Sequence, residues 1–216
     1  MIDFETARRH MVDGQVRTAD ITDPRIVSAM LKVPRERFVP QDLAALAYVD
    51  MHLAVSPGGE RRLLKPMVFA KLVQIAEIAP GDRVLDVGCA TGYGAAVLAL
   101  VAGQVVALEQ DSRLAEAARS TLADQPNVTV VTGPLTGGWP QGGPYDAIIL
   151  EGATEVEPDM FLPQMKDGGR LVCVLNGPAS RGMLYVRAGN DLGGRPVFDA
   201  GAPVLPGFAK APAFAF

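Results

Sequence analysis

The chain contains 216 residues, of which 49% are hydrophobic and 20% are charged. This length fits one domain, and the apolar content is sufficient for a folded core, which excludes an intrinsically disordered protein. Lys and Arg together number 20 and Asp and Glu number 24, so the net charge is −4. Proteins that bind nucleic acid or anionic membranes usually carry a basic excess, and we therefore expect neither as a partner.

Few residues are available for a metal site or a disulfide. The chain contains two cysteines, Cys89 and Cys173, and two histidines, His10 and His52. They form no CxxC or Cys/His cluster, so we expect no metal and no disulfide framework. The N-terminal sequence lacks the layout of a signal peptide, and no apolar run is long enough to span a bilayer. We therefore expect a soluble, cytoplasmic protein.

Residues 1–80 precede the first predicted core strand and contain two helix signals. Asp23 followed by Pro24 combines a preferred N-cap residue with proline at the first helical position, which predicts a helix over residues 25–33. Pro66 begins a second predicted helix, which has an apolar stripe. We expect this region to form a helical extension of the domain.

From residue 81 onward, short β-branched runs alternate with alanine-rich helical segments. Strands are predicted at residues 83–88, 105–109, 128–131, 145–150 and 170–175, and helices at residues 93–102, 112–122 and 159–165. Strands that alternate with helices require crossover connections, which produce a parallel sheet covered on both faces. The predicted fold is an α/β domain with a doubly wound, mostly parallel, Rossmann-like sheet.

The character of the chain changes after residue 176. Strands predicted at residues 183–188 and 195–200, with the turn-rich segment 189–194 between them, indicate a C-terminal β-hairpin. The tail that follows is rich in Pro, Ala and Phe and shows no clear period. We therefore divide a single domain into an extension (1–80), a core (81–176) and a hairpin with its tail (177–216).

The clearest motif is Val84-Leu-Asp-Val-Gly-Cys-Ala-Thr-Gly-Tyr93, which runs from a predicted strand through a glycine-rich turn into a helix. Glycine at Gly88 and Gly92 lets the backbone turn tightly and approach a ligand, and the amides of the helix N-terminus face the same place. Glu109 ends the next strand, where a carboxylate can accept hydrogen bonds from both hydroxyls of a ribose.

The spacing of this motif excludes two common nucleotide sites. A phosphate-binding P-loop needs Gly-Lys-Ser/Thr, and no lysine lies between Lys71 and Lys166. A dinucleotide fingerprint needs glycine at its first, third and sixth positions, which here hold Gly88, Ala90 and Tyr93. An NAD-dependent dehydrogenase therefore conflicts with the glycine spacing.

The acid-x-Gly-x-small-x-Gly pattern resembles the first motif of class I S-adenosylmethionine-dependent methyltransferases. In that family the loop holds the amino-acid portion of the cofactor, the acid of the second strand holds the ribose, and the loop after the third strand lies near the adenine. The resemblance implies a cofactor site formed by Asp86, Gly88, Cys89, Ala90, Gly92, Glu109, Gln110, Gly133, Pro134 and Leu135.

Further segments are similar to protein-L-isoaspartate O-methyltransferases, in the same order along the chain. They are Val33-Pro-Arg-Glu-Arg-Phe-Val-Pro40, Ala47-Tyr-Val-Asp50, the helix that begins at Pro66, Gly137-Gly-Trp-Pro140 and Pro144-Tyr-Asp-Ala-Ile-Ile149. This resemblance extends over roughly residues 5–176. It implies methyl transfer from S-adenosylmethionine to the carboxylate of L-isoaspartyl residues in damaged proteins or peptides, with residues 1–80 on the substrate side.

Three positions depart from that family's pattern. Leu64 stands where an Ile-Ser-x-Pro segment usually supplies a serine beside the methyl-transfer site. Pro134 stands where a Gly-Asp-Gly segment usually supplies an acid, and proline offers neither a carboxylate nor a backbone N–H. The C-terminal tail also lacks the family's usual Arg-Phe-Val-Pro-Leu.

We assign no catalytic residue from the sequence; the substrate-side candidates are Leu64, Lys65, His52 and Glu151. A carboxylate acceptor has a pKa of about 4 and is already ionised at neutral pH, so it needs no general base. Lys65 or neighbouring Arg62 could attract it in place of the missing serine. An amine or phenol acceptor would need a base, for which Glu151, expected just past a core strand, and Glu155 are candidates.

Two alternatives keep the cofactor but change the function. A methyltransferase with another acceptor, either a small molecule or another protein group, is favoured by the missing serine. A relative that binds the cofactor or a partner protein without catalysis is favoured by the altered adenine loop and the apolar tail. The sequence does not indicate an oligomeric state.

Overall fold

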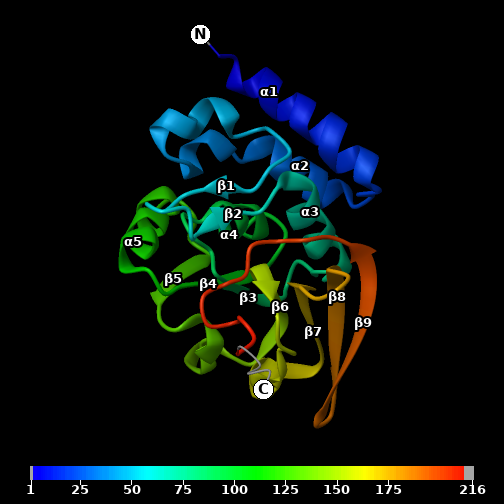
Figure 1. Cartoon of the computed structure of the whole chain (residues 1–216). Helices are drawn as coiled ribbons and strands as arrows, with labels where there is room; N and C mark the ends of the chain where they lie inside the picture. The colour runs from blue at the N-terminus through cyan, green and yellow to red at the C-terminus, as the bar shows by residue number, and fades with distance from the viewer. Residues whose placement is uncertain (1, 212–216) are drawn as a thin grey trace, which may run out of the picture.

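A seven-stranded sheet forms the centre of the computed structural model, which describes residues 2–211 (Figure 1). The strands are β3 (Arg83–Val87), β4 (Gln104–Glu109), β5 (Val128–Thr132), β6 (Tyr145–Thr154), β7 (Met165–Leu175), β8 (Arg181–Ala188) and β9 (Asp191–Asp199). Their order is β5-β4-β3-β6-β7-β8-β9, in which β3 to β7 are parallel and β8 and β9 antiparallel. The predicted doubly wound, mostly parallel fold with a C-terminal hairpin is confirmed.

Side chains alternate along the central strands into two hydrophobic cores. On one face, Val84, Val105 and Ile149 pack against the helices α2 (Pro24–Lys32), α3 (Pro66–Ile75), α4 (Tyr93–Leu98) and α5 (Ser112–Thr121). On the other face, Leu85, Leu108 and Leu150 pack against short 3-10 segments and the C-terminal tail. Burial on both faces explains why these strands appear in the sequence as continuous apolar runs.

The N-terminal region lies over the first of these faces (Figure 1). It contains α1 (Phe4–Met11), the π-helical turn Val12–Val16, α2, the 3-10 segments Arg17–Ala19, Arg35–Phe38 and Gln41–Leu46, and the short hairpin of β1 (Leu53–Ala54) and β2 (Arg62–Leu63). The Asp23 side chain caps α2 by accepting from Arg25 N–H, and Pro66 is the first residue of α3, as predicted. Helix α1 was not predicted from the sequence.

Three predicted elements differ from the structure. The helix expected over residues 93–102 ends at Leu98, and the chain turns so that Gly103 N–H donates to Asp82 O. Residues 159–165 form a 3-10 segment, Asp159–Gln164, which contains Pro163 and therefore lacks one amide donor. The hairpin turn is shorter than the predicted 189–194, because Gly193 and Gly194 already pair with β8.

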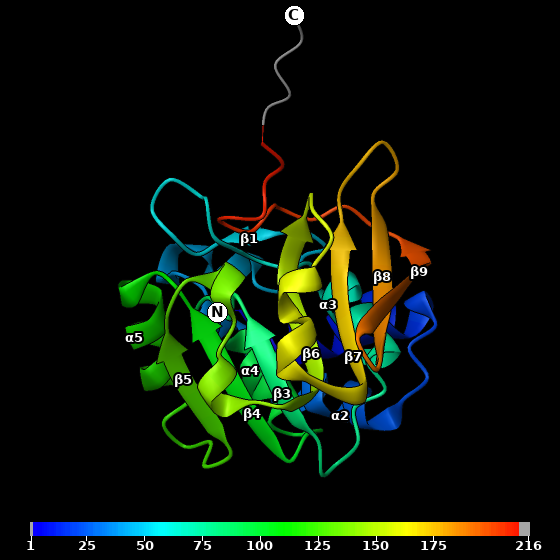
Figure 2. The ribbon, with the colours of Figure 1, turned by 90° about the horizontal axis from the view of Figure 1, so that it is seen from below.

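The C-terminal tail runs back over the carboxyl ends of the parallel strands (Figure 2). Across residues 2–211, no helix has the combination of length and apolar character needed to cross a membrane. The tail matters for function because ligands of open α/β sheets bind at this edge, where the connections from neighbouring strands diverge.

Candidate functional site

The glycine-rich loop follows β3 at the point where the sheet order reverses, with β4 on one side of β3 and β6 on the other. Gly88, Ala90 and Gly92 all have left-handed backbones, with φ of 82°, 50° and 96°. The φ of Gly92 strains any residue with a side chain, and a Cβ there would also lie 2.7 Å from a methyl carbon of Leu122, so the position favours glycine. Ala90 adopts a conformation that glycine reaches more easily, which makes it a strained residue in the loop.

Glu109, at the end of β4, is fully buried and accepts four hydrogen bonds. Its Oε2 atom accepts from Ala90 N–H at 2.8 Å and from Arg61 Nη2 at 2.9 Å. Its Oε1 atom accepts from the backbone N–H of Gln110 at 2.9 Å and of Asp111 at 3.1 Å. Glu109 was predicted from the sequence to bind a ribose. In the structure it contacts the glycine-rich loop directly through Ala90, and through Arg61 it is linked to Gly88.

Arg61 also belongs to this site, although it was not predicted from the sequence. It is 5% exposed, and besides Glu109 its Nη2 atom donates to Gly88 O at 2.7 Å. The contact joins residues 48 positions apart, and nothing in the local sequence distinguishes Arg61 from an exposed loop arginine.

A second group of buried polar side chains lies beneath the loop, on Asp86, Glu151, Arg35 and Tyr93. Both carboxylate oxygens of Asp86, Oε1 of Glu151, Nη1 of Arg35 and the Tyr93 hydroxyl have no hydrogen-bond partner among residues 2–211. The Arg35 guanidinium stacks on the Tyr93 ring, with 4.5 Å between Cζ and the ring centroid. Unpaired buried polar groups are costly, and such a cluster is typical of a binding site rather than of a core.

Burial raises the pKa of Asp86 to about 7, and the nearby charge of Glu109 raises it as well. Burial together with the charge of Asp86 raises the pKa of Glu151 well above its usual value. In the ligand-free site, burial therefore favours the neutral, protonated forms of these two carboxyl groups.

Glu151 corrects one prediction made from the sequence. The sequence predicts it just past the end of a core strand. In the structure β6 continues to Thr154, and Glu151 is 3% exposed within it. Its carboxylate lies so close to the backbone of Gly94 that a Cβ at that position would collide with it.

The N-terminal segment around Arg35 packs against the glycine-rich loop. Arg35 is fully buried and donates to Ala47 O and Leu64 O, each at 2.8 Å. Phe38 packs edge-on against Tyr93, with ring centroids 5.7 Å apart, and its carbonyl accepts from the Thr91 hydroxyl. The segment from Val33 to Pro40 therefore holds the glycine-rich loop in place through Arg35 and Phe38.

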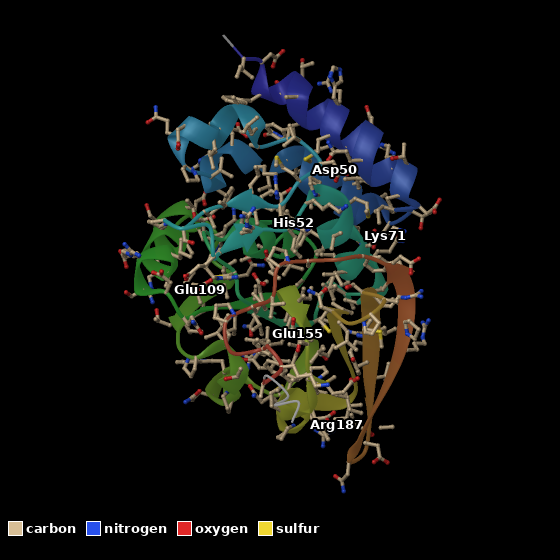
Figure 3. The ribbon with its side chains drawn as sticks, in the orientation of Figure 1. Asp50, His52, Lys71, Glu109, Glu155 and Arg187 are labelled. Atoms are coloured by element: carbon tan, nitrogen blue, oxygen red, sulfur yellow. The ribbon has the colours of Figure 1, made fainter. Side chains whose placement is uncertain are left out.

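The substrate-side candidates lie on the hairpin before α3 and beside the tail. Leu64 is 2% exposed and belongs to the core, whereas Lys65 is partly exposed and its N–H donates to Nδ1 of His52 at 3.1 Å. Nε2 of His52 lies 3.3 Å from Gly201 O, so a neutral His52 links this hairpin to the tail. Burial lowers the pKa of His52, which favours that neutral form. Figure 3 shows His52, Glu109 and Glu155 around the tail.

The remaining residues that were predicted to bind the cofactor include Gly133, Pro134 and Leu135, which follow β5 at the carboxyl end of the sheet. Gly133 N–H donates to Glu109 O at 3.1 Å, Leu135 is buried in the second core, and Pro134 precedes it in an extended conformation. The Cys89 side chain is fully buried, and burial raises the pKa of its thiol. This supports packing as the role of Cys89.

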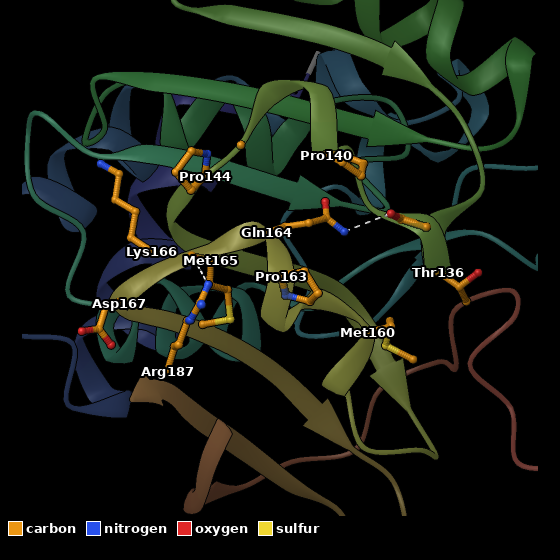
Figure 4. Close-up of a pocket in the computed structure, with 12 residues that line it drawn as sticks. Thr136, Pro140, Pro144, Met160, Pro163, Gln164, Met165, Lys166, Asp167 and Arg187 are labelled. Carbon is orange, nitrogen blue, oxygen red and sulfur yellow. Dashed lines mark hydrogen bonds between the residues drawn. The ribbon is translucent and has the colours of Figure 1, made fainter. Parts of the chain in front are cut away.

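A separate cavity of about 880 Å³ lies at the amino end of β7 (Figure 4). Three of its polar side chains are already engaged: Arg187 donates to Leu162 O, Gln164 donates to Gly137 O, and Lys166 pairs with Asp146. This cavity shares no residue with the site at the carboxyl end of the sheet.

A family model described as protein-L-isoaspartate(D-aspartate) O-methyltransferase matches residues 6–192. The chain belongs to this family. The family uses S-adenosylmethionine, in agreement with the cofactor that the glycine loop indicated. The resemblance to protein-L-isoaspartate O-methyltransferases that was predicted from the sequence is thereby confirmed.

Relatives in this family are similar over most of their length. A protein-L-isoaspartate O-methyltransferase of Pelotomaculum thermopropionicum is 38% identical over 188 residues, which is 86% of this chain and 81% of that protein. One of Methylorubrum extorquens is 39% identical over 191 residues, 88% of this chain and 83% of that protein.

Solved structures show the same fold. A protein-L-isoaspartate O-methyltransferase structure has a TM-score of 0.80 and 26% identity, over 93% of this chain and 66% of that one. A Plasmodium falciparum structure in complex with S-adenosyl-L-homocysteine has a TM-score of 0.76 and 16% identity, over 92% of this chain and 97% of that one.

Proposed function

We propose that this chain transfers a methyl group from S-adenosylmethionine to the carboxylate of L-isoaspartyl residues in proteins or peptides. Its family and its relatives' names support this activity. The observation that carries the proposal is the group of unpaired buried side chains at the carboxyl ends of β3 and β6, because it matches the charged end of the cofactor.

The residues present fit S-adenosylmethionine. The carboxylates of Asp86 and Glu151 would hold its α-ammonium group, and the unpaired donors of Arg35 and Tyr93 would hold its α-carboxylate. Glu109 would accept from the ribose hydroxyls. The bound cofactor supplies a methyl group activated by its sulfonium, so the task of the chain is to position the two reactants.

The acceptor needs no general base from this chain. An isoaspartyl carboxylate is ionised at neutral pH and is itself the nucleophile. Leu64 is buried and offers no hydroxyl, so we assign attraction of this anion to Lys65, whose backbone is fixed by His52. A protein or peptide is therefore the expected partner. As part of this proposal, we place the reaction in the cytoplasm.

The test is transfer of labelled methyl from S-adenosylmethionine to an isoaspartyl peptide, with the same peptide carrying a normal aspartyl residue as control. We expect label on the isoaspartyl peptide alone. Asp86→Asn should reduce transfer and weaken cofactor binding, whereas Asp124→Asn on the exposed surface should change neither. Cofactor binding without label on the isoaspartyl peptide would refute the proposed acceptor and leave another acceptor or a non-catalytic role.

A further inference from the structure

The C-terminal tail pairs with β6 through one parallel bridge, between Val204 and Ala153, at the edge where the site lies (Figure 2). Ala153 N–H donates to Pro203 O at 2.7 Å, and Leu205 N–H donates to Ala153 O at 2.9 Å. We call residues 201–210 the C-terminal strap.

Further contacts hold the strap on both sides of this pairing. At its start, Gly201 O lies 3.3 Å from His52 Nε2. Towards its end, Phe208 is fully buried and stacks on Phe161, with ring centroids 6.2 Å apart, and its carbonyl accepts from Glu155 N–H at 2.9 Å. The strap is therefore a docked part of the fold, joined to β6, to His52, to Phe161 and to the backbone of Glu155.

Leu205 of the strap fills the crevice between β3 and β6. It is 1% exposed and packs directly on two glycines, Gly88 after β3 and Gly152 within β6. A Cβ would lie 3.0 Å from Leu205 at Gly88 and 2.6 Å from it at Gly152. This crevice, where the sheet order reverses, is the place where open α/β sheets bind their ligands.

Arg61 occupies the neighbouring part of the same edge. A Cβ at Gly88 would lie 2.9 Å from Arg61 Nη2, so Arg61 and Leu205 cover the same glycine. A carboxylate has about four acceptor positions, and Glu109 uses four, one of them for Arg61. A ribose hydroxyl can therefore bond to Glu109 fully only when Arg61 leaves.

We propose that the C-terminal strap and Arg61 form an autoinhibitory cover of the cofactor site, which must be displaced before S-adenosylmethionine binds. This inference rests on the proposed function, because it takes the covered edge to be the cofactor site. The cover and the cofactor compete, so the apparent dissociation constant equals the intrinsic one divided by the fraction of molecules with an open strap.

The first test compares binding of S-adenosylhomocysteine by calorimetry to the wild-type chain and to two variants. Leu205→Ala removes buried side-chain carbons that hold the strap closed, and Arg61→Gln removes the competing cation from Glu109. We expect each variant to bind about tenfold more tightly. The controls are Leu192→Ala, which does not touch the strap pairing, and Arg195→Gln, which is exposed on β9.

A second variant closes the strap covalently. Ala153 and Val204 are paired residues, so Ala153→Cys with Val204→Cys should form a disulfide across the pairing. We expect the oxidised form to bind S-adenosylhomocysteine at least tenfold more weakly than the same protein after reduction. In the wild-type chain, ligand should also speed hydrogen exchange of the Leu205 amide, which is a readout independent of activity.

The outcomes separate the cover from the proposed function. Equal or weaker binding by both Leu205→Ala and Arg61→Gln, or slower exchange at Leu205 with ligand, would overturn the cover while methyl transfer to the isoaspartyl peptide remained measurable. No binding to any variant, together with no labelled peptide, would overturn the cofactor assignment and the cover with it.

Discussion

Asp86→Asn is expected to make the ligand-free protein more stable while it weakens cofactor binding. Asp86 is fully buried, and neither of its carboxylate oxygens has a partner among residues 2–211. Asparagine has nearly the same shape but never ionises, so the substitution removes the free energy of holding an uncompensated negative charge in the core.

The magnitude follows from the pKa of Asp86. A change of one in pKa corresponds to about 1.4 kcal/mol, and burial raises the value from 3.8 to about 7. Because the folded state holds the proton more tightly than the unfolded chain, this group lowers stability as pH rises from about 4 to 7, and the loss stays constant above that range. The variant should be more stable by about 2 kcal/mol at pH 5.5 and about 4 kcal/mol at pH 8.

The assay is urea unfolding of wild type and variant at several pH values, with Asp124→Asn as the exposed control. The difference between Asp86→Asn and wild type should widen by about 2 kcal/mol from pH 5.5 to pH 8. Calorimetry with S-adenosylhomocysteine should show at least about tenfold weaker binding, since a hydrogen bond to a charged group contributes about 1.5–3 kcal/mol. Parallel pH profiles, or a variant less stable at pH 8, would refute the reasoning.

Three further predictions concern the residues around the loop. Arg35→Met should lower the free energy of unfolding by about 3 kcal/mol in urea, because two buried carbonyls lose their donor. Ala90→Gly should raise it by about 0.5–1 kcal/mol in the same assay, since glycine adopts the left-handed backbone without strain; no gain would contradict this. The lowered pKa of His52 means that its neutral form stabilises the fold above about pH 6.5 and that this contribution is lost on acidification. His52→Gln should therefore show a smaller loss between pH 6.5 and 5 than the wild type, measured as the change in the thermal unfolding midpoint.

Local sequence was sufficient to predict the glycine loop and the core strands, and to place Glu109 at the end of its strand. The motif from Val84 to Tyr93 contains its own turn residues, and the apolar runs on either side indicate strands buried on both faces. These features depend on neighbours in the sequence, which is why their positions agree with β3, β4 and α4 to within a few residues at the ends.

The features that could not be predicted depend on residues far apart in the chain. Glu151 looked like a loop residue because the apolar run ends at Leu150, yet β6 continues and pairs with the strap at Ala153 and Val204. Arg61 likewise shows no local pattern, since only the fold brings it to Glu109. Periodicity and propensity carry no information about such contacts.

Charge explains why Arg61 can serve as a reversible cover. With the strap closed, Arg61 supplies a positive charge to the buried carboxylate of Glu109, and removing that charge alone would leave an unpaired buried anion. S-adenosylmethionine carries a net positive charge, so the exchange of Arg61 for the cofactor conserves the charge of the site. After methyl transfer the sulfonium charge is lost, and the return of Arg61 to Glu109 then competes more effectively with S-adenosylhomocysteine. The same contact that restricts entry of the cofactor would therefore promote release of its product.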